Sequence, residues 1–237
     1  MSDAAGFDPT FDFRTDAGGG DPDATSPTLK AYHKLLWSKP LPSGDPFLDD
    51  TEPDAYLHHL SARGEFYLTS DAAIPTFIRY LRMAKVVPLI PESERDQFDT
   101  ITYQMGGMML FPGNKIERKQ TINGAKGFNP QIRDRLDLTV ECIRRLYLGE
   151  TSPLAETLIR YGDFFTLFQD FNGYTAFFLL QDLVSDDSSA VKFFIPFADF
   201  GTSPLPPTVE VYQDYRRNAI RFVEARNRRM AEYVARL

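Results

Sequence analysis

The chain of 237 residues contains a single cysteine, Cys142, and only three histidines. One cysteine excludes an internal disulfide framework and a zinc site built from several thiolates. The sequence also lacks an apolar run of the roughly 20 residues that a membrane-spanning helix needs. Its first residues, MSDAAGFDPTFDF, have neither the basic start nor the apolar core of a signal peptide. We therefore expect a soluble, cytoplasmic protein without a membrane partner.

Basic residues are in the minority but are concentrated in two segments. The chain has 26 Lys and Arg against 33 Asp and Glu, a net charge of −7, which argues against a general nucleic-acid partner. Residues 106–145 nevertheless hold eight basic and four acidic residues, and residues 216–237 hold seven Arg against two Glu. Either segment suits a phosphate group, and a solvated helix face explains the same counts.

The composition divides the chain into an arm and a body. Residues 1–26 are rich in Gly, Asp, Pro, Ser and Thr, which predicts an irregular arm. Phe7, Phe11 and Phe13 alternate with polar residues and are placed to hold this arm against the body. We predict that residues 27–237 form a single globular domain.

Local signals in the body predict a mostly helical α+β fold with a small antiparallel sheet in the first half. The expected strands are short and rich in β-branched, aromatic and apolar residues: 65–69, 100–103, 108–111 and a further one at 116–122. We expect helices at 27–36, after Ser26-Pro27, and at 53–62. Three further helices are expected: one capped by Ser70-Asp71, one that starts at Asn129-Pro130 and ends at Gly149, and a last one capped by Thr208.

The Gly-, Lys- and Arg-rich stretch 106–135 contains the first candidate site, the segment TINGAKGFNP at 121–130. Glycine allows a close approach of the backbone, and a helix that starts at Pro130 would point its positive end at this segment. The expected binding residues for a phosphate-bearing molecule or nucleotide are Asn123, Gly124, Lys126, Gly127, Arg133 and Arg135. The alternative is a structural connection capped by Asn129, whose basic residues pair with Glu117, Asp134 and Asp137.

A second candidate combines His33 with the segment GEFYLTSD at 64–71. A histidine followed by such a strand is similar to the opening half of ADP-ribosyltransferase folds. The resemblance implies that His33 and Tyr67 hold the nicotinamide ribose and ring of NAD. No later strand carrying that family's catalytic glutamate is identified, and a helix end with an edge strand explains the same residues.

A third candidate consists of Asp99, Glu117 and Lys119. A carboxylate on one strand and Glu-x-Lys on its neighbour is the arrangement that binds Mg²⁺ in one class of nucleases. Because Glu-x-Lys is frequent by chance and this assignment requires a β-hairpin, we predict no metal site.

Several longer phrases resemble a family of uncharacterised bacterial proteins. They are TLKAYHKLLWSKPLPSG, TYQMGGMMLFPGNKI, TINGAKGFN, DRLDLTVECIRRLYLG and RFVEARNRR. The resemblance extends from about Phe11 to Arg229 and implies one co-folded unit without implying an activity. The expected function therefore still depends on the Gly-, Lys- and Arg-rich stretch 106–135, which predicts binding of a phosphate-bearing small molecule or nucleotide. One alternative is a non-catalytic module that binds a protein through its aromatic surface or its Arg-rich last helix. The others are an ADP-ribosyltransferase-like enzyme that uses NAD, and a nucleic-acid partner, which would require the two basic segments to lie on one face.

Overall fold

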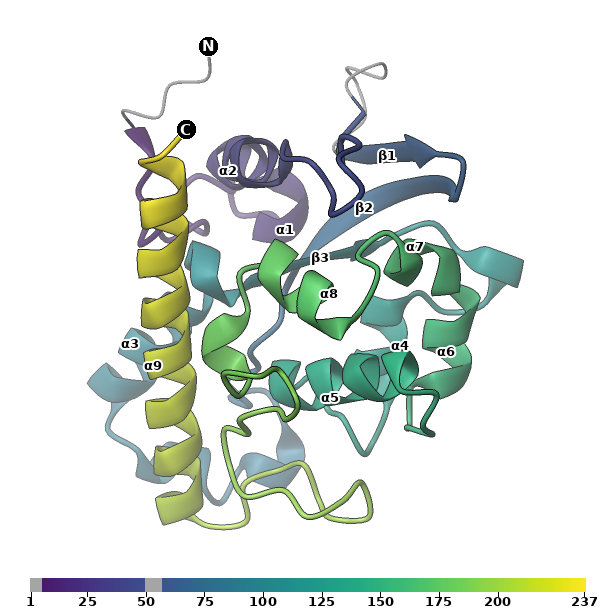
Figure 1. Cartoon of the computed structure of the whole chain (residues 1–237). Helices are drawn as coiled ribbons and strands as arrows, with labels where there is room; N and C mark the ends of the chain where they lie inside the picture. Colours follow the sequence, from purple (N-terminus) through teal and green to yellow (C-terminus); the bar gives the residue numbers. More distant parts are fainter. Residues whose placement is uncertain (1–5, 50–56) are drawn as a thin grey trace.

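The computed structural model describes residues 6–49 and 57–237 (Figure 1). The strands are β1 (His58–Ser61), β2 (Gly64–Ala72) and β3 (Met108–Pro112). The helices are α1 (Pro22–Thr25), α2 (Pro27–Trp37), α3 (Glu92–Thr102), α4 (Ile122–Phe128), α5 (Leu136–Tyr147), α6 (Ala155–Arg160), α7 (Gly162–Thr166), α8 (Phe171–Phe177) and α9 (Val209–Val234). The prediction of a mostly helical α+β fold with a small antiparallel sheet in the first half is confirmed.

The sheet is antiparallel in the order β1-β2-β3, with Tyr67 opposite His58 and Ser70 opposite Leu110. Side chains of a strand alternate between its two faces. Leu68 and Ser70 therefore lie on the buried face of β2, and Tyr67 lies on the exposed face. This alternation decides which of the candidate residues can meet.

Aromatic rings fill much of the core between the sheet and the helices of the second half. The ring of Phe168 lies 5.1 Å from the rings of both Phe177 and Phe178, and Phe47 lies 4.8 Å from Phe177. These separations are those of favourable tilted and edge-to-face ring pairs. The many phenylalanines of the sequence thus have a packing role in this region.

The long helix α9 (yellow in Figure 1) runs along one side of the molecule and ties distant segments together. Its Arg226 is fully buried and donates hydrogen bonds to the carbonyl oxygens of Gly106, Met108 and Phe178. Gly106 lies directly against the helix, because a Cβ atom there would be 2.4 Å from the carbonyl oxygen of Val223. Only glycine fits at this contact.

The described part of the arm, residues 6–26, contacts the body through its phenylalanines. Phe13 is fully buried, and the ring of Phe7 lies 4.6 Å from that of Tyr32. The backbone N–H of Met105 donates to the carbonyl of Pro9 at 3.0 Å. The arm therefore forms part of one wall of the body.

Three predictions of secondary structure along the first half are wrong. Residues 100–103 end the helix α3, because the preceding polar residues from Glu92 onward form a helix that carries Ile101 into the core. The residues around Ser70-Asp71 do not start a helix: β2 continues to Ala72. Residues 116–122 contain a 3₁₀ turn and the start of α4, with no strand.

Two helix starts also differ from the prediction. Residues 130–135 form turns, and α5 begins at Leu136, because Arg133 and Asp134 adopt positive φ angles of 50° and 66° that no α-helix accommodates. In the predicted helix 53–62, residues 58–61 are the strand β1, and residues 53–56 lie outside the described residues. In the described part of the chain, no helix combines the length and apolarity needed to cross a membrane.

Candidate functional site

The segment 121–130 is mainly the helix α4, and no helix starts at Pro130 to point its positive end at this segment. Thr121 caps α4, since its hydroxyl oxygen accepts a hydrogen bond from the N–H of Gly124 at 3.2 Å. A Cβ atom at Gly124 would meet nothing closer than 3.6 Å, and one at Gly127 nothing closer than 3.8 Å. Neither glycine is therefore required here for a close backbone approach or a special backbone angle.

Lys126 is enclosed between two carboxylates. Its side chain is 1% exposed, and its ammonium lies 2.6 Å from Asp71 of β2 and also pairs with Asp134. Burial alone would lower the pKa of Lys126, but the charges of Asp71 and Asp134 outweigh it and raise the pKa. The lysine is charged, and its charge is already matched inside the protein.

The other basic residues of this segment are mostly paired as well. Arg135 forms a buried ion pair with Asp137, and Lys119 lies 3.2 Å from Glu117. The alternative that Glu117, Asp134 and Asp137 pair with the basic residues is confirmed. The half-buried guanidinium of Arg133 forms no hydrogen bond or ion pair with another described residue, and the amide of Asn123 donates to Thr69 at 3.4 Å.

His33 and Tyr67 lie on opposite faces of β2. The Nε2 atom of His33 lies 2.9 Å from the hydroxyl of Ser70, and its Nδ1 atom accepts a hydrogen bond from the indole of Trp37 at 2.9 Å. Burial, with a contribution from Arg226, lowers the pKa of His33 to about 3, so the ring is neutral. Tyr67 is 41% exposed and donates to Glu65 at 3.0 Å. The structure does not bring the two residues together.

Asp99, Glu117 and Lys119 do not share a hairpin. Asp99 lies on α3 and pairs with Arg14 of the arm, whereas Glu117 lies in a 3₁₀ turn and pairs with Lys119. Across residues 6–49 and 57–237, no three His, Cys, Asp or Glu side chains are grouped as a metal ion would require.

A different site is formed where the arm meets the body, and we call it the arm cavity. It has a volume of about 450 Å³. It opens between four parts of the chain: the arm, the segment 72–80 that begins at the last residue of β2, the end of α3, and the turn before α5. Its polar lining comes from all four segments: Arg14, Thr76, Arg79, Tyr80, Asp99, Thr102, Tyr103 and Asp134. The volume is that of a typical small-molecule pocket.

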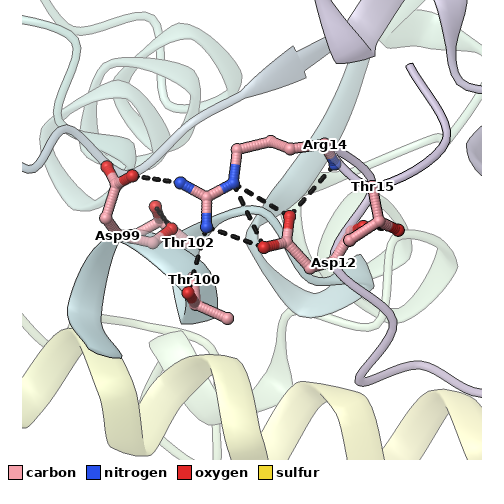
Figure 2. A network of polar contacts seen from close by, with 6 residues as sticks. All are labelled: Asp12, Arg14, Thr15, Asp99, Thr100 and Thr102. Carbon is pink, nitrogen blue, oxygen red and sulfur yellow. Dashed lines mark hydrogen bonds and ion pairs between the residues drawn. The ribbon is translucent and has the colours of Figure 1, made fainter. Parts of the chain in front are cut away.

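Arg14 lines the arm cavity and is held by the network of polar contacts drawn in Figure 2. Its guanidinium donates to Asp12 at 2.9 Å and to the hydroxyl of Thr100 at 3.0 Å, and it also pairs with Asp99. The hydrogen bond to Asp12 is the main cause that raises the pKa of Arg14, although partial burial opposes it. The arm is thereby bound to α3 by charge as well as by Phe13.

The segment 74–80, which also lines the cavity, is held by α9. The hydroxyls of Tyr212 and Tyr215 donate to the carbonyl oxygens of Thr76 and Pro75 at 2.6 and 2.9 Å. Phe77, between these carbonyls and Arg79, has a φ angle of 59°, which is costly for a side chain of this size. Strained backbone held in place by its surroundings is more frequent at functional sites than elsewhere.

Ionisable groups with shifted pKa values gather around the arm cavity. Burial raises the pKa of Asp134, against the opposing charge of Lys126. Burial also raises the pKa of Tyr80 and of Tyr103. Behind the wall, Asp23 accepts a hydrogen bond from the N–H of Ala72 at 3.1 Å, and burial together with the charge of Asp71 raises its pKa to about 7. Asp134, Tyr80 and Tyr103 line the cavity, which makes it a candidate functional site.

Sequence reasoning did not identify this cavity. Asp99 and Asp134 were noted for other reasons, and Arg14, Arg79, Tyr80 and Tyr103 were not singled out. Arg14 is 85 positions from Asp99 in the chain, so no local motif joins them. The available signal was Arg14 itself, the one basic residue among the six aspartates of residues 1–29.

The fold and the arm cavity define a mostly helical α+β domain with a polar cavity beside its small sheet. The chain matches a family model described as "Family of unknown function (DUF6994)" over residues 7–230. Because the match covers most of the chain, the protein belongs to this family. Comparisons with curated proteins and with solved structures give no significant match.

Proposed function

We propose that the protein binds a small polar molecule in the arm cavity, one that carries an acidic group together with amine or hydroxyl groups. The observation that carries this proposal is the presence of guanidinium and carboxylate groups in one cavity, from Arg14, Arg79, Asp99 and Asp134. A ligand that carries both an acidic and a basic or hydroxyl group can pair with the guanidinium and the carboxylate groups. A purely anionic ligand can pair only with the guanidinium groups, and a purely cationic ligand only with the carboxylates. The predicted cytoplasmic location agrees with a small-molecule ligand.

Arg79 is the group best placed to bind the acidic part of the ligand. Its side chain is exposed and forms no hydrogen bond or ion pair with another described residue, whereas Arg14 is held by Asp12 and Asp99. An unpaired guanidinium binds carboxylate or phosphate in a bidentate manner. Arg79 therefore offers charge that the protein does not already use.

Asp134 and the two tyrosines suit the amine or hydroxyl groups of the ligand. Lys126 bonds to the Oδ1 atom of Asp134, and Asp134 also lines the cavity. Tyr80 and Tyr103 are protonated at neutral pH, as tyrosines ordinarily are, and burial raises the pKa of both further, so each hydroxyl can donate. The acidic and the donor ends of a ligand thus have separate partners.

The predicted phosphate site at 121–135 receives less support from the geometry. One ammonium, that of Lys126, stands between two carboxylates, which leaves this cluster with a net charge of −1 (+1 from Lys126 and −2 from Asp71 and Asp134). An anion next to it is repelled. The NAD proposal also receives less support, for a geometric reason: His33 and Tyr67 lie on opposite faces of β2.

The experiment is a thermal-shift screen of the whole chain against amino acids, sugar phosphates, polyamines and nucleotides including NAD, followed by calorimetric titration of any hit. We expect a hit with both an acidic and an amine or hydroxyl group. Arg79→Ala should weaken its binding at least tenfold. The matched control Arg82→Ala removes another exposed arginine, three positions away, that does not line the cavity. Absence of any hit, or equal effects of the two variants, would refute the proposal.

A further inference from the structure

A second cavity, separate from the arm cavity, lies between α9 and the segment 192–194. We call it the α9 groove. Its volume is about 460 Å³, and its lining includes Lys192, Phe193, Arg221, Ala225 and Arg228. The sequence already indicated an Arg-rich last helix, but not which of its arginines share a cavity.

Three basic side chains in the α9 groove are unpaired. Lys192, Arg221 and Arg228 are exposed, and none forms a side-chain hydrogen bond or ion pair with another described residue. Arg216, Arg217 and Arg229 on the same helix are paired with Glu94, Asp214 and Asp182. Of these α9 arginines, Arg221 and Arg228, which line the groove, are therefore the two without a partner among the described residues.

Nearby acids do not neutralise the groove. The one carboxylate in its lining, that of Asp182, is bound by Arg229 through two bonds of 3.0 Å. Glu224 lies one turn from both Arg221 and Arg228, but it does not line the groove and pairs with neither in the described structure. The lining itself carries a charge of +2 (+3 from Lys192, Arg221 and Arg228 and −1 from Asp182), on a chain whose net charge is −7, and the charge of Asp182 is matched by Arg229 just outside the lining.

The arrangement of these cations suits phosphate groups. Arg221 and Arg228 are seven residues apart, so they share one face of α9 about 10.5 Å apart along its axis. Ala225 lies between them and leaves space that a larger side chain would fill. Two long arginine side chains across this span can hold one or two phosphates, with Lys192 supplying charge from the opposite wall.

The opposite wall is rigid and aromatic. The N–H of Phe194 donates to the carboxylate of Asp137 at 2.9 Å, and Asn218 of α9 donates to the carbonyl of Phe194 at 2.9 Å. Phe193 lines the groove, is only partly buried and lies 4.4 Å from Phe197, ring to ring. A partly exposed ring on a fixed backbone is suited to stack against a planar ring of a ligand.

From these observations we infer that the α9 groove binds a nucleoside phosphate, with its phosphates between Arg221, Arg228 and Lys192 and its base against Phe193. This second site does not depend on the function proposed for the arm cavity. It requires no bond to be made or broken.

The test is calorimetric titration of the whole chain with ATP, pyrophosphate and adenosine. The double variant Arg221→Gln/Arg228→Gln should weaken ATP binding at least tenfold. Its control, Arg63→Gln/Arg82→Gln, removes the same charge from two exposed arginines outside the groove and should leave binding within twofold. Phe193→Ala should weaken ATP several-fold while leaving pyrophosphate unchanged, which would identify the base contact.

Other outcomes would overturn the inference. These are no ATP binding at millimolar concentration, equal loss in both double variants, or an unchanged ATP affinity in Phe193→Ala. A single-stranded oligonucleotide that binds more tightly than ATP, with a steep dependence on salt, would also overturn it, because the ligand would then be a nucleic-acid strand. Circular dichroism of each variant confirms that it is folded, and Arg79→Ala tests the arm cavity separately.

Discussion

Replacing Lys126 by methionine is the most direct test of the charge cluster beside the arm cavity. The substitution keeps the length of the side chain and removes the ammonium that pairs with Asp71 at 2.6 Å and with Asp134. Because the lysine is buried and its two partner carboxylates are only partly exposed, solvent screens these pairs weakly. Removing one partner of a buried ion pair typically costs about 3–5 kcal/mol in the free energy of unfolding.

The expected change in thermal stability follows from the size of the chain. For proteins of this length, 1 kcal/mol shifts the Tm by about 2–4 °C, so we expect a decrease of about 6–20 °C. The control Lys115→Met removes an exposed lysine without an ion pair in the described structure and should shift the Tm by less than about 2 °C. The assay is thermal and urea unfolding of both variants beside the unchanged protein.

The pH dependence of this loss provides a second check. Without the ammonium, Asp71 and Asp134 are two partly buried carboxylates close to each other, and burial already raises the pKa of Asp134. A carboxyl group whose pKa is higher in the folded state stabilises the fold below its unfolded pKa of about 4 and loses that contribution as the pH rises. The deficit of Lys126→Met should therefore be smallest near pH 4 and grow towards pH 8. A loss below about 1 kcal/mol, or one independent of pH, would refute the described pairing.

Three further predictions concern other buried groups. Asp23 has a pKa raised to about 7, so the free energy of unfolding should fall between about pH 4 and 8, and urea unfolding of Asp23→Asn should show a smaller fall. An unchanged slope would contradict this. Arg226→Met leaves the carbonyls of Gly106, Met108 and Phe178 buried without a donor and should lower stability in urea by at least about 3 kcal/mol; a loss under about 1 kcal/mol would be inconsistent with those bonds. Gly106→Ala should destabilise the fold strongly, because its Cβ would lie 2.4 Å from a carbonyl oxygen. Gly124→Ala in α4 should instead raise the free energy of unfolding by about 0.5–1 kcal/mol, because its Cβ would meet no close atom. Similar thermal shifts for the two variants would contradict the described surroundings of the two glycines.

Helix boundaries that depend on local chemistry could be predicted from the sequence. Ser26 and Thr208 cap α2 and α9 through their own hydroxyls, and Gly149 takes a φ of 70° after α5. Each signal acts within a few residues of its position, so no knowledge of the rest of the fold is required. The same reasoning failed at residues 100–103, where β-branched and aromatic residues complete a helix because tertiary packing overrides propensity.

The candidate site could be predicted only in part, because most of its contacts join residues that are far apart in the sequence. Asp134 is eight residues from Lys126, and its pairing with the basic residues of that segment was an open alternative that the structure confirms. Asp71 comes from β2, and its approach to Lys126 depends on how α4 packs over the outer face of the sheet. The arm cavity depends on four separate segments, and no spacing in the sequence reports their meeting.

The role of α9 has a consequence for the order in which this protein is made. Its hydrogen bonds to Thr76, Pro75, Gly106 and Met108 join residues 118–140 positions apart. A ribosome releases the earlier segments first, so the strained stretch around Phe77 has no clamp until the last helix emerges. We expect a nascent chain that stops before residue 209 to leave apolar surface of the core uncovered and to need a chaperone, because such long-range contacts form slowly.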